Sequence, residues 1–541
     1  MRDIPLTRKL LANEGGVAEA TTSSEPWEHG RSSAVIDGME IVDDIGHQRS
    51  VSHRYLFFLT LCAGGLQVVF SVIMSNGTPF LRSLGLSQSL TALVWAAGPL
   101  AGTFVQPIVG LLSDQCQDPW GKRKPFMAGG AAATITCMLL LAWTKDLVTL
   151  VTWYIGGDAY GDRAQTTTII LAIVWVYALN AAIQPVQSAI RAFIIDNCPA
   201  HQQSEATTWA SCIMGIGTIL GYLSGFLKLK ESESFLGNTQ FKAMCVIASF
   251  ALGITVAISC TMIQERDPRV MDSTKRTKLS TAAFFTQLYM SFRTMPPVTW
   301  KVCQAQFFSW MGWFPFLFYV TTYVGNFYSK PIFAARPDLT KGQQDAVTAH
   351  AIRIGTFAAL IFAVIALVSN FTLPFLVAVS SREKSFLANS GRPIPSSFTI
   401  PGLTLPRAWT LSHLLFGICM ICTLFAKSAM SSAVLVGLVG ISRALTLWAP
   451  FALISEEVAA RQLRRSYSDS VELQSSAPGQ AGAIMGLHNM AIASPQIVSA
   501  LMCSVLFYLL QAAGVDDTIG WTLVFGGISA LIAAYLSSRI S

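Results

Sequence analysis

The sequence predicts an all-α membrane protein whose twelve transmembrane helices form two six-helix bundles. Three observations lead to this fold class. Hydrophobic residues make up 52% of the chain and charged residues only 12%, whereas about a quarter of an ordinary soluble domain is charged. Twelve apolar segments reach the roughly 20 residues that are needed to cross about 30 Å of hydrocarbon. A basic, polar segment separates the first six of them from the last six.

The predicted spans follow one another along the whole chain after a polar start. The tenth and eleventh are the least regular, because small and polar residues interrupt their apolar runs. The spans are predicted at approximately 55–78, 89–112, 125–144, 167–192, 206–227, 241–263, 302–325, 349–377, 409–427, 431–455, 480–510 and 520–538.

These spans divide the chain into four parts. Residues 1–54 are rich in Ser, Gly, Asp and Glu and are expected to form a disordered cytoplasmic tail. Residues 55–263 form the predicted N-terminal bundle, 264–301 a cytoplasmic linker, and 302–541 the C-terminal bundle. In transporters built from two such repeats, the substrate site lies near the midplane of the membrane between the halves.

Two segments outside the spans have their own predicted character. The polar, Ser-rich segment 456–478 is expected to be a disordered loop. The linker contains apolar residues at spacings that suggest an amphipathic helix on the membrane surface. These residues are Phe284, Phe285, Leu288 and Met290.

The distribution of Lys and Arg predicts that both termini are cytoplasmic. With the N-terminus inside, most of these residues fall in the tails and in the loops on the same side, as the positive-inside rule requires. The net charge of +7 is therefore a topology signal, and nucleic acid is not an expected partner. No signal peptide precedes the first span, which would itself direct insertion. A plasma membrane is the expected location, with a vacuolar membrane as the alternative.

The sequence gives no indication of an enzyme, a metal site or a cofactor. It contains no Gly-rich nucleotide loop, no cluster of metal ligands and no nucleophile–base pair with the spacing of a known family. Cys419 and Cys422 form a C-x-x-C pair, but both lie inside the ninth apolar span. Because a redox or zinc site needs thiolate character and further partners, we interpret these cysteines as packing residues.

Residues 106–126 read QPIVGLLSDQCQDPWGKRKPF and join the second and third predicted spans. This segment resembles the loop between the second and third helices of the major facilitator superfamily, whose pattern is G-x-x-x-D, a spacer, then G-[RK]-[RK]. Gly110, Asp114, Gly121, Lys122 and Arg123 occupy the corresponding positions. The resemblance implies alternating access, with Asp114, Lys122 and Arg123 contributing charges to a gate at the cytoplasmic side.

Longer blocks resemble the sucrose and α-glucoside transporters, the glycoside–pentoside–hexuronide group, and most closely their fungal branch. The second span reads VWAAGPLAGTFVQPIVGLLSD, the fourth ends in NAAIQPVQSAIRAFIID, and the seventh contains FSWMGWFPFLFY. The fourth-span block places Arg191 and Asp196 at the positions of the group's R-A-x-x-x-D ending. This resemblance implies a sugar such as sucrose or another α-glucoside as the transported molecule.

Two departures leave the coupling ion open. Sucrose–proton symporters resemble this chain in the fourth helix but have an Asp where Asn180 stands, and they have carboxylates in the seventh helix where this chain has none. If transport is a proton symport, the expected carriers are Asp196 and His488. A buried neutral histidine is, however, more often a packing residue. Two interpretations of His488 therefore stay open, a proton carrier and a packing residue.

Ionisable residues inside spans are costly and are hypotheses for function. Arg191 either reaches the headgroups, as long side chains do, or contacts ligand. Arg443 lies too far from either flank for that and is expected to face the substrate path. Amides and aromatic rings suit sugar hydroxyls and C–H faces, although each also packs between helices. The predicted substrate-binding residues are Gln67, Gln106, Asn180, Gln184, Gln187, Arg191, Trp313, Arg443 and Asn489.

Together these features predict a multi-pass secondary active transporter that works as a monomer, with a small molecule, membrane lipid and in one reading protons as its partners. Sugar transport is the first hypothesis. An exporter of a fungal secondary metabolite, or of another, anionic, organic solute, is the alternative that the two arginines and the missing carboxylates favour. A nutrient sensor without transport is a third, but the tail is short for signalling.

Overall fold

The computed structural model describes most of the chain after residue 49. The described residues are 50–114, 116–158, 161–199, 202–227, 237–265, 286, 289–290, 292–377, 399–468 and 480–540, without the side chains of 107, 111, 114, 204, 455, 456, 458–468 and 480–486. The expected disordered tail therefore lies outside the described residues up to 49, and so do Phe284, Phe285 and Leu288 of the predicted linker helix.

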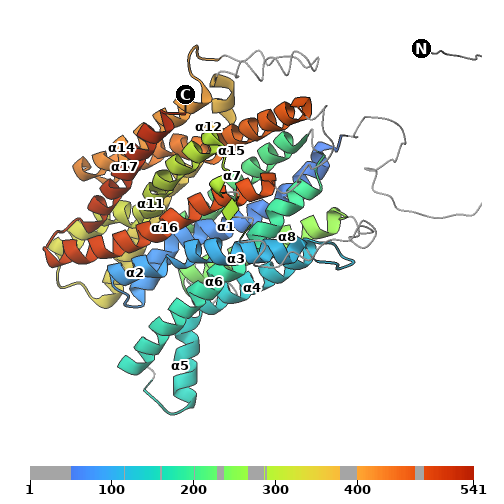
Figure 1. Cartoon of the computed structure of the whole chain (residues 1–541). Helices are drawn as coiled ribbons and strands as arrows, with labels where there is room; N and C mark the ends of the chain where they lie inside the picture. Colours follow the sequence, from blue (N-terminus) through green and yellow to red (C-terminus); the bar gives the residue numbers. More distant parts are fainter. Residues whose placement is uncertain are drawn as a thin grey trace, which may run out of the picture. The chain divides into compact units, whose positions relative to one another are not determined.

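The described part of the chain is helical, and no strand occurs in it. Figure 1 shows the long helices running beside one another. Their bounds are α1 His53–Ser83, α2 Gln88–Val94, α3 Ala97–Asp114, α4 Lys124–Ala142, α5 Thr144–Tyr154, α6 Asp162–Asp196, α7 Gln203–Phe226, α8 Gln240–Met262, α11 Pro297–Ala335, α12 Lys341–Leu376, α14 Leu405–Cys422, the 3-10 turn η2 Thr423–Phe425, α15 Ala429–Ser468, α16 Gln480–Ala512 and α17 Thr518–Ser537.

Among the described residues, eleven stretches are long and apolar enough to cross a membrane, with α2 and α3 counted as one. Helix α11 is the twelfth long helix, at 39 residues. It is rich in Trp, Tyr and Pro, which lower its hydropathy, and for this reason it is not among the eleven. The prediction of twelve membrane helices is therefore confirmed by eleven apolar helices and one long aromatic helix.

Helices dominate because the hydrocarbon of a membrane contains no partner for backbone N–H and C=O groups. The ends of the helices outside the hydrocarbon use side chains instead. The Ser52 hydroxyl accepts the Tyr55 N–H at the start of α1. Thr340 and Gln343 form a capping box at the start of α12, each side chain accepting the other's backbone N–H.

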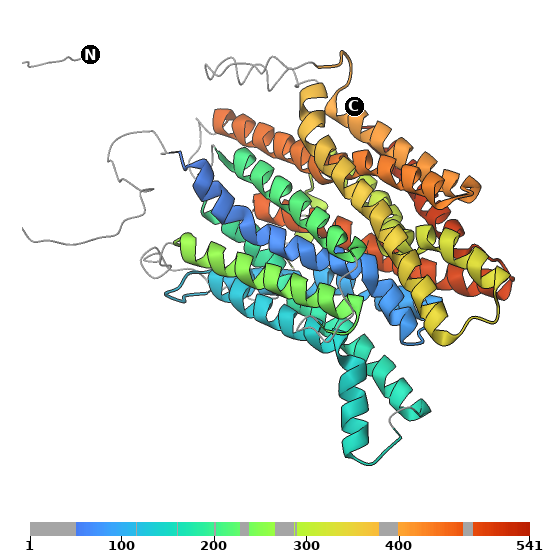
Figure 2. The same ribbon diagram turned by 180° about the vertical axis from the view of Figure 1, so that it is seen from behind.

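The twelve helices pack in two sets of six, as predicted. In the first set α1 packs on α7 and α8, and α6 packs on α3 and α4; in the second, α11 packs on α17, α12 and α16, and α15 packs on α12 and α14. The two sets meet through α7 with α12, α16 with α2 and α3, and α1 with α11. Figure 2 shows the same bundle from behind.

We call the end of the bundle that carries Ser52, Lys122, Glu265 and Pro297 the basic end, and the other the far end. Helices α5 and the start of α6 form a hairpin that projects from the far end in both views (Figures 1 and 2). No predicted span covers residues 145–166 of this hairpin, because they lack a continuous apolar run. The expected loop 456–478 is also partly wrong, since α15 continues to Ser468.

Small residues allow the helices of one set to approach closely, as is common in membranes. The clearest case is Gly355 of α12, where an added Cβ would lie 1.9 Å from the Thr321 carbonyl oxygen of α11. That neighbour is backbone and cannot move aside without shifting a helix.

We expect Gly355→Ala to destabilise the protein by about 1–3 kcal/mol, the usual cost of overpacking. The measurement is the apparent melting temperature of the purified protein in detergent. Gly342→Ala is the matched control in the same helix, because nothing lies within 4 Å of its added Cβ. Equal melting temperatures for the two variants would contradict the close contact of α11 and α12.

Candidate functional site

A polar contact at the boundary between the two sets joins α3, α6 and α16. The Asn489 amide nitrogen donates to Gln106 Oε1 at 2.9 Å, and Arg191 Nη1 donates to Asn489 Oδ1 at 3.4 Å. Three of the predicted substrate-binding residues, from helices of both sets, are thus brought together. The arrangement presents amide and guanidinium groups whose remaining hydrogen-bonding positions suit a polar ligand.

Gln184 lies one helical turn after Asn180 on α6, and the two side chains differ in what they contact. Gln184 Nε2 donates to the Asn180 carbonyl at 3.4 Å, while its buried Oε1 has no hydrogen-bond partner. The Asn180 amide instead donates to the Val176 carbonyl at 2.8 Å, and its oxygen packs where a Cβ on Gly98 would lie, at 2.9 Å. Asn180 therefore fills the contact between α6 and α3, and Gln184 is the better placed for a ligand.

Gln67 and Gln187 are half-buried on α1 and α6. Among the described residues neither side chain has a hydrogen-bond partner, and no contact ties them to the Asn489 group. Their assignment to the substrate site remains a prediction.

Arg443, in the first half of α15, lies beside two tryptophans of α11. Its guanidinium carbon is 5.4 Å from the ring centres of both Trp310 and Trp313, and its buried Nη1 has no hydrogen-bond partner. A cation–π contact contributes up to about 2 kcal/mol, whereas removing a charge from water costs several kcal/mol. The two rings do not fully offset the cost of removing the Arg443 charge from water. The unpaired Nη1 therefore suits a ligand or a water molecule that supplies a hydrogen-bond acceptor.

Trp313 itself is only 1% exposed and packs against Phe316 and Phe416 of the second set. Its neighbour Trp310, one helical turn earlier, has a buried indole N–H without a partner. Trp310 is thus the better candidate for a ligand contact, although the sequence analysis chose Trp313 from the same block.

His488 of α16 is 1% exposed and lies between an amide and a ring. Its Nε2 is 3.5 Å from Gln306 Nε2 of α11, and its ring meets Phe451 of α15 edge-on at 4.8 Å. The oxygen of the Gln306 amide is buried without a partner. Gln306 was not identified from the sequence, since glutamines in an aromatic span give no pattern that marks one of them.

Direct contacts close the boundary between the sets at the far end. Thr78 of α1 donates to the Phe318 carbonyl of α11 at 2.9 Å, and Thr321 donates back to the Ser75 carbonyl at 3.1 Å. Trp95, at the break between α2 and α3, stacks on Phe318 at 4.9 Å and donates to Thr78. Just beyond them lies a polar pocket of about 200 Å³ that Arg82 and Asp517 help to line.

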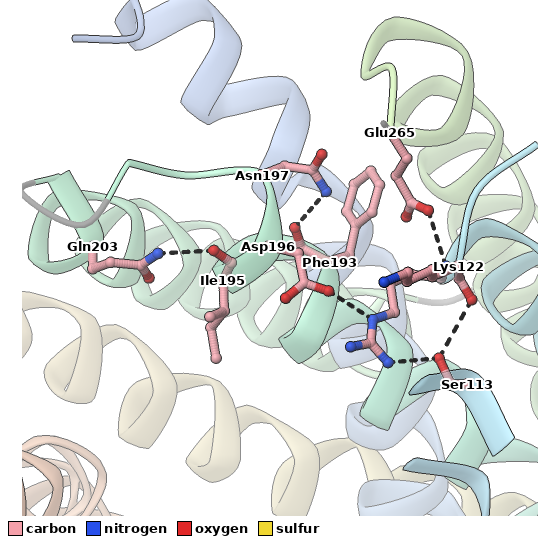
Figure 3. Close-up of polar contacts among 9 residues, drawn as sticks. Ser113, Lys122, Phe193, Ile195, Asp196, Asn197, Gln203 and Glu265 are labelled. Carbon is pink, nitrogen blue, oxygen red and sulfur yellow. Dashed lines mark hydrogen bonds and ion pairs between the residues drawn. The ribbon is translucent and has the colours of Figure 1, made fainter. Parts of the chain in front are cut away.

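A second polar cluster lies at the basic end and is contained within the first set (Figure 3). Arg123 is 8% exposed. Its Nε donates to Asp196 Oδ2 at 2.8 Å and its Nη1 to Ser113 Oγ at 2.8 Å, while its backbone N–H donates to Glu265 Oε2 at 3.0 Å. Four elements, the ends of α3, α4 and α6 and the segment after α8, are joined by this one residue.

The predicted gating residues take different places in this cluster. Lys122 is half-buried, and its carbonyl accepts the Ser113 hydroxyl at 3.4 Å. Asp196 pairs with Arg123 at the basic end, away from the Asn489 contacts. The side chain of Asp114 lies outside the described residues, so its predicted role remains untested.

Glu265 belongs to the same cluster and was missed by the sequence analysis. It directly follows an apolar span and lies in a charged segment, where a carboxylate gives no signal by itself. An added Cβ on Gly121 would lie 2.0 Å from Glu265 Oε2, and φ there is +130°, so the glycine provides both the turn and the room for the carboxylate. Burial raises the pKa of Glu265, an effect that the Arg123 N–H and the charge of Lys124 oppose.

Comparison with known proteins gives one family and several relatives. The Major Facilitator Superfamily family model matches residues 5–222 and 56–500. A protein from Schizosaccharomyces pombe described as "General alpha-glucoside permease" is 34% identical over 90% of this chain and 93% of its own length. Sucrose transport protein SUT2 from Oryza sativa subsp. indica is 26% identical, over 84% of this chain and 87% of its own.

Among solved structures, a D-xylose–proton symporter covers 90% of this chain and 98% of its own, with a TM-score of 0.54 and 13% identity. The nucleoside transporter NupG covers 90% and 99%, with a TM-score of 0.52 and 12% identity. At identities this low, the similarity concerns the fold alone. It extends over 90% of this chain in both cases.

We expect Glu265→Gln to change how stability depends on pH. The raised pKa means that the folded protein holds a proton that the unfolded chain has already released, so the contribution of Glu265 to stability is present below its ordinary value of 4.5 and falls as the pH rises through the folded pKa. The melting-temperature difference between wild type and variant should therefore shift across this range, on the order of 1 °C. A melting-temperature difference that does not depend on pH would contradict the buried carboxylate.

Proposed function

This chain belongs to the Major Facilitator Superfamily, and on that premise we propose that it carries a small glycoside such as sucrose or another α-glucoside across a membrane by alternating access. The relative that supports this substrate class is described as a general alpha-glucoside permease and aligns with 90% of the chain. We further propose that the basic end faces the cytoplasm, in a plasma membrane rather than a vacuolar one.

One observation from the structure carries the substrate proposal. Buried polar atoms without hydrogen-bond partners occur on helices of both sets, and they comprise acceptors as well as donors. They include Gln184 Oε1, Gln306 Oε1, Trp310 Nε1 and Arg443 Nη1. Because a sugar hydroxyl both donates and accepts, a neutral polyol can pair with acceptors and donors alike, whereas an anion can pair only with the donors.

Two aromatic rings add to this complementarity. The Trp310 and Trp313 rings each lie 5.4 Å from the Arg443 guanidinium carbon, and indole faces suit the C–H surface of a sugar ring. The far-end contacts of Trp95, Thr78 and Thr321 belong to a closed state of that end in this scheme, and they must separate when the site opens there.

The direct test is uptake of radiolabelled sucrose and maltose by yeast that lack their own transporters, at two pH values and with or without an uncoupler. We expect accumulation of at least one sugar over vector-only cells. An absence of uptake for both sugars, with the protein at the cell surface, would reject the glycoside proposal. In that case the alternative is export of an anionic solute, to which Arg191 and Arg443 would be the complementary charges.

Within the same assay, Gln184→Leu should raise KM for the sugar about tenfold or more, because a buried site that loses a hydrogen bond discriminates strongly. Gln344→Leu is the matched control. That glutamine is exposed in the first turn of α12, at the far end of the bundle, and its side chain donates to the Leu339 carbonyl. An unchanged KM in Gln184→Leu would remove this residue from the site.

We also propose that His488, rather than Asp196, carries the proton if transport is coupled. His488 contacts Gln306 between the helices, whereas Asp196 is held by Arg123 at the basic end. We expect His488→Gln to exchange sugar down its gradient but to lose accumulation driven by a pH gradient. His413→Gln, which alters another buried histidine of the second set, is the control. A His488→Gln variant that still concentrates sugar would refute this assignment.

A further inference from the structure

Helix α5 exposes an apolar stripe at the far end of the bundle. Leu147, Leu150, Val151 and Tyr154 are 38%, 60%, 54% and 86% exposed. Their spacing of i, i+3, i+4 and i+7 places them on one face of the helix. Val148, at 5% exposed, belongs to the face that packs toward the rest of the protein, so the exposed stripe is not the one that holds the hairpin in place.

The base of this helix is fixed at the level where the membrane helices end. Asp146, in its first turn, pairs with Lys242 Nζ at 2.7 Å, and Lys242 also lies 5.4 Å from the ring centre of Trp143. Lys242 is in the first turn of α8, and Trp143 directly follows α4. Figure 1 shows α5 leaving the bundle from this point, away from the long helices.

The partner helix of the hairpin gives the position of the membrane surface. Helix α6 has 35 residues and is therefore roughly 52 Å long, well beyond the hydrocarbon thickness of about 30 Å. Its first turns carry the exposed, charged Asp162 and Arg163. Exposed Ile170 and Val174 follow, at 55% and 50%, where the helix presents apolar side chains outward. The first turns of α6 and the adjoining α5 thus lie at the edge of the hydrocarbon.

We propose that the α5 stripe docks into the lipid headgroup and upper acyl region of the leaflet at the far end. The aromatic residues at its tip, Trp153 and Tyr154, are 71% and 86% exposed and are the types that concentrate at membrane interfaces. Exposed apolar residues also occur on the neighbouring α6, at Ile170 and Val174. The stripe itself contains no charged residue, so the docking requires no anionic lipid.

Photo-crosslinking identifies the occupant directly. The full chain, reconstituted in vesicles of a single phosphatidylcholine, would carry p-benzoylphenylalanine in place of Tyr154, an exchange of one exposed aromatic residue for another. After irradiation, mass spectrometry of the peptide should show a phosphatidylcholine adduct. The matched position is Lys145, which is exposed two residues before Leu147 and so on the opposite face of the helix.

We expect the lipid adduct at position 154 to exceed that at 145 by about fivefold or more, as for an amphipathic helix lying in the interface. The same replacement at Leu150 provides a second measurement of the lipid adduct, from the middle of the stripe. Equal adducts at 145 and 154, or none at either stripe position in a protein that elutes as a single species, would overturn the proposal. A crosslinked dimer in place of the lipid adduct would overturn it in favour of a second copy of the chain.

Discussion

The absence of hydrogen-bond partners in hydrocarbon is the constraint on which the rest of this structure depends. Backbone N–H and C=O groups are satisfied by forming helices. Many hydroxyl groups are satisfied by donating to a backbone carbonyl of their own helix. Thr60 donates to the Leu56 carbonyl, and Thr168 to the Ala164 carbonyl.

Against this background, a buried polar atom without any hydrogen-bond partner is informative. Gln184, Gln306 and Arg443 each retain such an atom, and they lie on helices of both sets. The groups that the membrane penalises most are thus the ones that a polar ligand would satisfy.

Some glycine contacts within a set are backbone against backbone, whereas one glycine contact between the sets ends on a side chain. Within the first, an added Cβ on Gly217 would meet the Gly64 carbonyl at 2.4 Å, and within the second, one on Gly440 would meet the Phe362 carbonyl at 2.6 Å. Between the sets, Gly215 of α7 faces the tip of Leu367 of α12 at 2.5 Å. Backbone against backbone is rigid, because a displacement moves a whole helix. The end of a leucine side chain can change rotamer, and this boundary can therefore slide while each set stays intact.

Hydropathy predicted the membrane helices from the sequence, because each span carries its own signal within about 20 residues. Elements that depend on surroundings were not predicted. Helix α5 is apolar on one face only, and α15 extends into a polar segment that hydropathy assigns to a loop. At the candidate site, residue type identified Gln106, Arg191 and Asn489, which meet across the boundary. It could not separate Gln184 from Asn180, since the difference lies in whether Gly98 stands opposite. The role of Glu265 could be recognised only from its contacts with Gly121 and Arg123 in the structure.

The two polar networks at the basic end indicate how such a molecule moves. In the first set Arg123 joins the ends of α3, α4 and α6 to Glu265. In the second, the Glu457 carboxylate of α15 accepts the Val298 and Thr299 N–H groups at the start of α11, and Lys301 donates to the Arg539 carbonyl beyond α17. Each network ties helices of one set. A rotation of one set against the other leaves these bonds unchanged, so opening at the basic end need not break them. The bonds that do join the sets include those of Asn489 with Gln106 and Arg191 and the far-end contacts of Thr78 and Thr321. The energetic cost of alternation falls on contacts between the sets such as these.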